Sequence, residues 1–291
     1  MNNYNFETSE ELMKECINDL YLHPKKDSIK WSKITNQTPQ GKFAYPSQHI
    51  ASLITGVKGL GSAARGDDLA DGTEVKSCSR ADQLNRCKEC NTTVLSWQDE
   101  CSNCGSKNIT QDTSSHWIFT VKEQSELDLI TEKMPRLIFI LFDKEDLSME
   151  NIRIRAWAVN PKEKHVKDFF TDYFVNNYQK KMAKGETPSP CNLHPLKYDF
   201  LMMKPKLIFH AEILEEDISI LFWDIENPKE QPMPSILLKM DELEKVFEDK
   251  ISGLTKKKVV ELYPLIEQED LGKLVIREKR TKSYKNKYAR R

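Results

Sequence analysis

Four of the seven cysteines are spaced as two pairs that could hold one metal ion. Cys87 and Cys90 form one C-x-x-C pair, and Cys101 and Cys104 form a second pair after a gap of ten residues. Each pair can turn tightly enough to direct two thiolates to one metal, and two pairs complete a closed, structural zinc site. The spacing therefore predicts a zinc ribbon at about residues 84–108. A redox pair is the alternative, and two pairs at this spacing argue against it.

Acidic side chains and a lysine gather in the segment directly before the predicted ribbon. Those that could bind a metal or act in catalysis are Asp67, Asp68, Glu74 and Lys76. Carboxylate oxygens suit Mg²⁺, which shares its coordination with a phosphate. A neighbouring ammonium group can neutralise charge on that phosphate or deprotonate a water molecule. The alternative is an exposed acidic turn with a solvated ion pair, because a D-x6-E-x-K string is common by itself.

The Asp71-Gly72 dipeptide inside this segment is typical of a two-residue turn between two strands. The strand before the turn (residues 67–70) carries both aspartates, and the strand after it (residues 73–77) carries the glutamate and the lysine. In the expected pairing Asp67 shares a face with the glutamate and the lysine, whereas Asp68 points to the other face. A three-residue loop or a bulge would exchange the two aspartates. Either aspartate is therefore a candidate metal ligand.

Two further segments have side chains suited to phosphates. Ser77, Ser79 and Arg80 follow the acidic segment and supply hydroxyl groups and a cation. The last fifteen residues, 277–291, hold eight Lys or Arg and one acid. A basic tail of this kind can lie along a phosphate backbone, chiefly through Arg280, Lys282 and Lys285, or can be a solubilising terminus.

Helices and strands alternate along the chain on both sides of these residues. An apolar run at Leu137–Phe142 predicts a central strand that is buried on both faces. The alternation over Ile152–Val159 predicts a strand whose two arginines, Arg153 and Arg155, face either DNA or solvent. Further expected helices are residues 8–22, Pro46–Thr55, Asp168–Met182, Met240–Lys250 and Thr255–Leu262, and further expected strands are His116–Val121, Leu207–Leu214 and Ile218–Asp224.

Length and composition exclude several classes of protein. The 291 residues suggest one large domain or two modest ones. A hydrophobic fraction of 38% with 12 Phe, 9 Tyr and 5 Trp is enough for a core and excludes disorder throughout. The longest apolar run is too short for a membrane span, and the N-terminus lacks a secretory signal pattern. We therefore expect a cytoplasmic protein without a membrane partner.

The acidic segment resembles the PD-(D/E)xK nuclease superfamily. The likeness rests on Asp67 followed by Glu74-Val75-Lys76, after a helix and a glycine-rich loop, and covers about residues 45–145. The ribbon placed directly after this segment resembles the MamI type of restriction endonuclease more closely. Two features depart from the pattern: Gly66 stands where the superfamily has proline, and the leading helix has no acid, so that Gln48 is its nearest polar candidate.

The resemblance implies an α/β fold, a restriction-endonuclease-like mixed sheet flanked by helices with an inserted four-cysteine zinc ribbon. It implies that Asp67 or Asp68, Glu74 and the Val75 carbonyl hold Mg²⁺, and that Lys76 orients or deprotonates the attacking water. The expected regions are an N-terminal helical region (residues 1–38), a catalytic core (39–160) and a region for target recognition and dimerisation (161–291). The expected function is sequence-specific, Mg²⁺-dependent hydrolysis of double-stranded DNA by a homodimer. The alternatives are a repair-type nickase and a non-catalytic zinc-ribbon DNA-binding protein.

Overall fold

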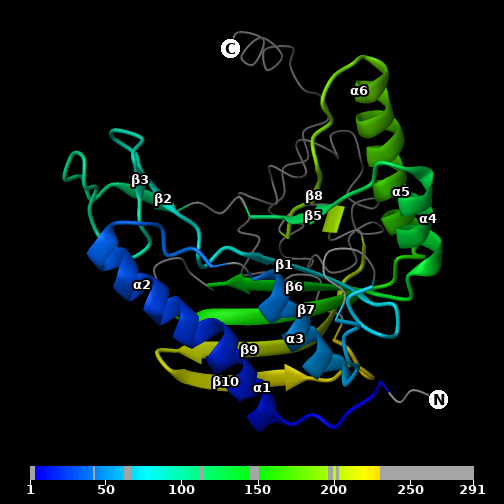
Figure 1. The fold of residues 1–291 in the computed structure, drawn as a ribbon, viewed down its shortest axis with the longest axis horizontal. Helices are drawn as coiled ribbons and strands as arrows, with labels where there is room; N and C mark the ends of the chain where they lie inside the picture. The colour runs from blue at the N-terminus through cyan, green and yellow to red at the C-terminus, as the bar shows by residue number, and fades with distance from the viewer. Residues whose placement is uncertain are drawn as a thin grey trace, which may run out of the picture.

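A five-stranded mixed sheet forms the centre of the computed structural model, which describes residues 4–41, 43–61, 67–111, 115–144, 151–195, 199–200 and 203–229 (Figure 1). The strands lie in the order β1 (Glu74–Ser79), β6 (Leu137–Asp143), β7 (Ile152–Val159), β9 (Lys206–Leu214) and β10 (Asp217–Trp223). β1 runs parallel to β6, and every other neighbouring pair is antiparallel. β1 is therefore an edge strand, and the candidate catalytic residues lie at this edge.

Helices cover one face of the sheet. An N-terminal helical segment consists of α1 (Glu10–Ile17), the π-helical turn η1 (Asn18–Leu22) and α2 (His23–Thr35), and is followed by α3 (Ala44–Thr55). Ser9 caps α1, because its Oγ accepts a hydrogen bond from the Leu12 N–H (3.2 Å). Apolar residues of α1, η1 and α3 pack against those of β6, β7 and β9. The helix expected over residues 8–22 is confirmed, and it continues without a break to Thr35.

The second face is covered by a small sheet and by further helices. The small sheet pairs β5 (Trp117–Phe119) with β8 (Cys191–Leu193). The helices are α4 (Gln124–Asp128), η2 (Leu129–Lys133), α5 (Lys164–Asp172), η3 (Tyr173–Gln179) and α6 (Lys180–Ala183). Rings from β5, β6 and α5 form the aromatic centre of this second core, where Phe119 contacts Phe170 with a centroid distance of 4.8 Å. The expected mixed sheet flanked by helices is confirmed.

The structure differs from the predicted hairpin around Asp71-Gly72. Residues 67–70 do not form a strand that pairs with β1; instead the Gly72 N–H bonds to the Leu69 carbonyl (3.0 Å) and the Leu69 N–H bonds to the Thr73 carbonyl (3.1 Å). Gly72 has a left-handed φ of +87°, which explains the glycine. The segment is therefore a tight turn that leads into β1, and it places Leu69 rather than Ala70 opposite Thr73.

Both arginines of β7 are buried, which corrects the prediction that they face DNA or solvent. Arg153 and Arg155 are 3% and 1% exposed, and both form ion pairs with Asp143 at the end of β6 (3.3 and 2.6 Å). Alternation along the strand predicts correctly that the two arginines share one face of the sheet. It does not show that this face, the second face, is covered by other elements. The buried carboxylate makes the burial of the two cations possible.

The chain continues the same sheet beyond the expected boundary near residue 161, because β9 pairs with β7. Our division into core and recognition regions stays a prediction. The helices expected at Met240–Lys250 and Thr255–Leu262, and the basic tail with Arg280, Lys282 and Lys285, lie outside the described residues. Within the described residues, no helix has the length and apolar character needed to cross a membrane.

We expect His210 of β9 to make the fold sensitive to acid. Burial, together with the charges of Arg155 and Arg153, lowers the pKa of His210 from 6.5 to about 4. The unfolded chain binds this proton near pH 6.5 and the folded chain only near pH 4. The free energy of unfolding should therefore fall as the pH falls through this window, by up to about 1.4 kcal/mol per pH unit from this residue.

Urea unfolding of the protein and of His210→Gln at several pH values between 7 and 4 measures this contribution. The variant should show a shallower loss of stability across the window, and His23→Gln, at an exposed site, serves as the control. Equal slopes for the protein and His210→Gln would contradict the assignment.

Candidate functional site

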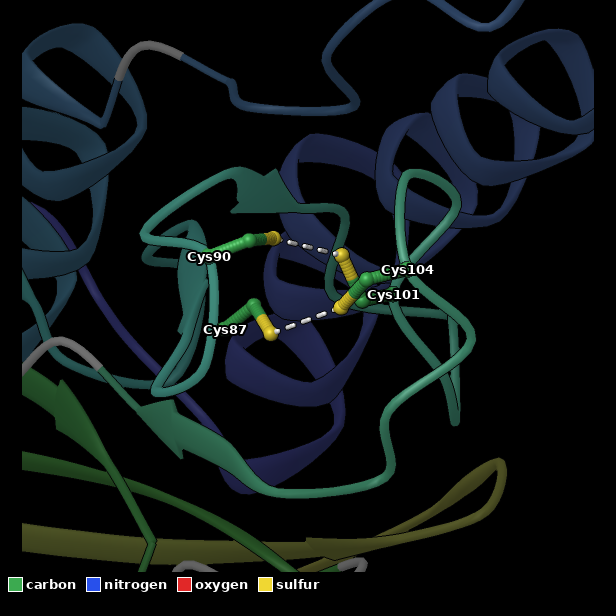
Figure 2. A group of neighbouring side chains, drawn as sticks. All are labelled: Cys87, Cys90, Cys101 and Cys104. Atoms are coloured by element: carbon green, nitrogen blue, oxygen red, sulfur yellow. Dashed lines mark hydrogen bonds between the residues drawn. The ribbon is translucent and has the colours of Figure 1, made fainter.

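The four predicted zinc ligands converge in one compact ribbon. Its strands β2 (Asn85–Cys87), β3 (Thr93–Val94) and β4 (Ile109–Gln111) form a sheet in the order β3-β2-β4. Figure 2 shows the sulfur atoms of Cys87, Cys90, Cys101 and Cys104 directed toward one another. The sulfur atoms lie within 4.8 Å of one another, and the Cys87–Cys104 and Cys90–Cys101 pairs are each 3.5 Å apart. Tetrahedral zinc with bonds of about 2.3 Å separates its sulfur ligands by about 3.8 Å, so the donor set fits zinc.

Two equivalent turns present the ligands. The Asn91 N–H bonds to the Cys87 carbonyl (2.9 Å), and the Gly105 N–H bonds to the Cys101 carbonyl (2.8 Å). Asn91 and Gly105 both have left-handed backbone conformations, with φ of 59° and 68°. Asn and Gly are the residues that adopt this conformation most readily, so each C-x-x-C pair is followed by a residue that suits the turn.

The electrostatics of the cluster favour a bound cation. Hydrogen bonds from the Thr92 and Asn103 side chains lower the pKa of Cys90 to about 5. A backbone hydrogen bond from Ser106 lowers the pKa of Cys104, but the adjacent Cys90 and Cys87 sulfurs outweigh it and the pKa rises to about 12. Four thiolates at these distances repel one another, and a divalent cation removes that repulsion.

The ribbon is anchored to the helical layer by Trp97, which lies between the two cysteine pairs. Its Nε1–H donates to the Oγ of Ser32 on α2 (2.8 Å), and Lys33 Nζ lies 6.0 Å from its ring centroid. Ser32 is buried, and its own hydroxyl donates to the Gln37 carbonyl. The position of the ribbon against the domain therefore depends on a hydrogen bond at a buried serine.

The second candidate site lies at the start of β1, where Asp68 contacts both the strand and α3. One Asp68 carboxylate oxygen accepts a hydrogen bond from the Val75 N–H (2.7 Å), and the other accepts one from Gln48 Nε2 on α3. Asp67 Oδ2 lies near the turn, 3.9 Å from the position that a Cβ at Gly72 would take, and its negative charge acts on both Asp68 and Glu74. Of the two candidate aspartates, the tight turn thus brings Asp68 into contact with the backbone of β1.

Glu74 and Lys76 project from the same face of β1. Their side chains form an ion pair with a distance of 2.5 Å between Lys76 Nζ and Glu74 Oε1. Lys76 Nζ also lies 5.3 Å from the ring centroid of Phe119 on β5. The ammonium group is therefore held between a carboxylate and an aromatic ring.

Burial raises the pKa of both carboxyl groups. For Asp68, hydrogen bonds from Val75 and Gln48 and the charge of Lys76 offset part of the rise. For Glu74, Lys76 offsets part of the rise, and the negative charges of Asp68 and Asp67 add to it. These carboxylates are partly desolvated and repel each other, which is the electrostatic environment that a divalent cation relieves.

The Val75 carbonyl points to the same outer edge of the sheet as the Val75 N–H. The Glu74 N–H bonds to the Arg136 carbonyl on the β6 side (3.2 Å), whereas the Val75 N–H bonds to Asp68 on the open side. In a strand the N–H and C=O of one residue point the same way, so the Val75 oxygen is directed away from β6. Two carboxylates and one carbonyl fit Mg²⁺, which keeps several water ligands. Among the described residues, the cysteines are the only group of three or more His, Cys, Asp or Glu side chains whose ligand atoms converge within 4.8 Å.

The three described residues that we expected to contact phosphates differ in burial and in hydrogen-bond partners. Ser79 is buried, and its hydroxyl donates to Asp82 (2.6 Å), so its placement does not support a contact with DNA. Ser77 is half-buried, and its hydroxyl donates to the Phe43 carbonyl (3.3 Å). Arg80 is also half-buried and lies near the buried Arg155. Contacts of Ser77 and Arg80 with DNA stay predictions.

Sequence reasoning missed Asp82, which links the end of β1 to the helical segment. Its carboxylate accepts hydrogen bonds from Tyr21 (3.1 Å), Lys25 (2.5 Å) and Ser79 (2.6 Å). Tyr21 and Lys25 lie one helical turn apart in η1 and α2, about sixty positions before Asp82. Only the spacing of Tyr21 and Lys25 is visible in the sequence, and it does not indicate their distant partner.

We expect one zinc ion per chain, bound by the four cysteines. Replacement of a buried ligand, Cys101→Ser, should abolish zinc binding and loosen the ribbon, because the remaining cluster is open. Trp97 then loses its fixed position at Ser32, so the near-ultraviolet circular dichroism of tryptophan should change. Zinc is measured by atomic absorption.

Cys16→Ser is the matched control, since Cys16 lies in α1 outside the ribbon. It should keep the zinc. A purified protein that lacks zinc, or a Cys101→Ser variant that keeps it, would contradict the assignment.

Known proteins are similar in sequence to a large part of this chain. Residues 30–240, more than half of the chain, match the MamI restriction endonuclease family. The type II restriction enzyme MamI of Microbacterium ammoniaphilum is 29% identical over 154 residues, and the match covers 52% of this chain and 44% of the relative. No solved structure has significant similarity to this chain. The extent of the family match shows that the chain belongs to the MamI restriction endonuclease family.

Proposed function

We propose that this protein is a type II restriction endonuclease that hydrolyses double-stranded DNA at a specific sequence with Mg²⁺. The observation that carries the proposal is the hydrogen bond from the Val75 N–H to Asp68 at the open edge of β1, next to the Glu74–Lys76 ion pair. Family membership supports the same activity, and the curated relative is itself named as a type II restriction enzyme.

The residues of the site would have two roles: some would bind the metal ion, and Lys76 would face the phosphate of the substrate. Asp68, Glu74 and the Val75 carbonyl would hold Mg²⁺, and Gln48 would orient the Asp68 carboxylate. When bound, the ion supplies Lewis-acid stabilisation of the phosphate and a water molecule with a lowered pKa. Gln48 and the Val75 N–H leave lone pairs on both Asp68 oxygens, because each carboxylate oxygen can accept more than one partner.

Lys76 is suited to stabilise the negative charge that grows on the phosphate as water attacks. The ion pair with Glu74 holds the Lys76 ammonium group at the open edge of β1. A fixed cation beside the reacting phosphate acts without reorganisation during the reaction. We therefore infer that Lys76 orients the water and neutralises the phosphate.

A homodimer suits this activity because a two-fold symmetric protein matches a palindromic duplex site. Each protomer would then cut one strand.

Cleavage of bacteriophage DNA tests the proposal. With Mg²⁺ the protein should yield discrete fragments, whereas Glu74→Gln and Lys76→Ala should each slow cleavage by about 10²–10³-fold, because each removes a group that acts in the transition state. Both variants should still retard DNA on a native gel. Glu15→Gln, on the exposed surface of α1, should cut normally.

Other results would point to other functions. Nicked but unbroken DNA would indicate the repair-type enzyme, and bound but intact DNA from several sources would indicate a non-catalytic DNA-binding protein. Full activity of Glu74→Gln would reject the proposed site.

A further inference from the structure

The zinc ribbon presents an exposed row of three side chains across its three strands. Arg86 of the central strand β2 is directly opposite Thr93 of β3 and Thr110 of β4. All three side chains are exposed. We propose that this row, which we call the Arg86 row, binds the phosphate backbone of the duplex beside the cleavage site. The inference rests on the proposed function, since it assigns a part of the DNA contact to the ribbon.

The Arg86 row is held facing outward by the zinc site. The residues that alternate with it, Cys87 and Val94, are buried in the small core of the ribbon together with Cys101. Cys87 is adjacent to Arg86 in β2, so a bound zinc fixes the backbone that carries the arginine. A side chain on a fixed strand loses less conformational entropy when it binds a ligand.

The charge of this face suits a polyanion. Arg86 is the only charged residue in β2, β3 and β4. Within the described part of the chain, Arg86 has no ion-pair partner. The acids of the ribbon, Glu89, Asp99 and Glu100, lie in the connections between strands. No carboxylate on the strands therefore competes with a phosphate for the guanidinium group.

The chemistry of the row is that of backbone contacts rather than base reading. Arginine has a planar set of donors that can bind two phosphate oxygens together. Threonine hydroxyls donate to phosphate oxygens and are frequent in such contacts. Adjacent strands are about 4.8 Å apart, so the two threonines lie about 10 Å apart with the arginine between them.

The ribbon lies within reach of a duplex that occupies the catalytic site. β1, which carries Lys76, leads directly to β2, and Arg86 follows Lys76 by ten positions, which span at most about 35 Å. One turn of B-DNA is about 34–36 Å long. The hydrogen bond between Trp97 and Ser32 attaches the ribbon to α2 of the helical layer. The separation of Lys76 and the Arg86 row therefore does not exceed about one helical turn of a duplex.

Fluorescence anisotropy with the zinc-loaded protein tests the inference. The probe is a fluorescein-labelled duplex of random sequence, several helical turns long, with Ca²⁺ in place of Mg²⁺. Arg86→Gln should weaken binding by about tenfold, because a charge-assisted hydrogen bond is lost. The slope of log Kd against log salt concentration should fall by about 1, as expected for one lost phosphate contact.

Three comparison variants sharpen the result. Arg86→Lys should keep the salt slope, since it keeps the charge. The double variant Thr93→Val, Thr110→Val keeps the β-branched shape and should weaken binding without changing the slope. Lys14→Ala removes a charge from α1 and should bind as the unchanged protein does. Zinc content verifies that each ribbon is folded.

The inference is overturned if the Arg86→Gln variant binds the duplex with unchanged affinity and an unchanged salt slope. It is also overturned if Lys14→Ala loses as much affinity for the duplex as Arg86→Gln does. A protein that binds DNA through Arg86 but never cleaves it would refute the proposed function while the Arg86 row stands. A protein that cleaves DNA normally but is insensitive to Arg86→Gln would refute the Arg86 row alone.

Discussion

The hydrogen bond from the Val75 N–H to Asp68 joins the acidic turn to the open edge of β1. An edge strand has unpaired backbone groups on one side. Here Asp68 satisfies one of them, and Gln48 of α3 holds the other carboxylate oxygen. This places Asp68 beside the backbone of β1, where its charge and that of Glu74 influence each other and Lys76 is close to both. The site depends on β1 being at the edge, because an additional strand would occupy the Val75 backbone groups.

The other end of β1 is tied to the ribbon and the helices. Asp82 receives hydrogen bonds from Ser79 at the end of β1 and from Tyr21 and Lys25 of the helical segment. A few residues later the chain enters the ribbon. Trp97 of the ribbon donates a hydrogen bond to Ser32 of α2. One short strand therefore connects the candidate catalytic carboxylates, the helical layer and the four-cysteine cluster.

Local patterns in the sequence predicted the strands β1, β6, β7, β9 and β10 and the four-cysteine cluster, since alternation, apolar runs and paired cysteines are local signals. The choice between Asp67 and Asp68 could not be made in this way, because it depends on a one-residue difference in the turn at Gly72. The burial of Arg153 and Arg155 was also missed, since their partner Asp143 belongs to another strand. Gln48 was visible as the nearest polar residue of its helix, but its contact with Asp68 required the fold.

Binding of Mn²⁺ to the zinc-loaded protein tests the central claim most directly, because it requires neither the recognition sequence nor cleavage. Electron paramagnetic resonance of free Mn²⁺ during a titration measures the affinity of the site. Asp68→Asn and Glu74→Gln should each abolish high-affinity binding, and Asp67→Asn should keep it. Binding that survives in Asp68→Asn and is lost in Asp67→Asn, or that none of the three variants changes, would contradict the account.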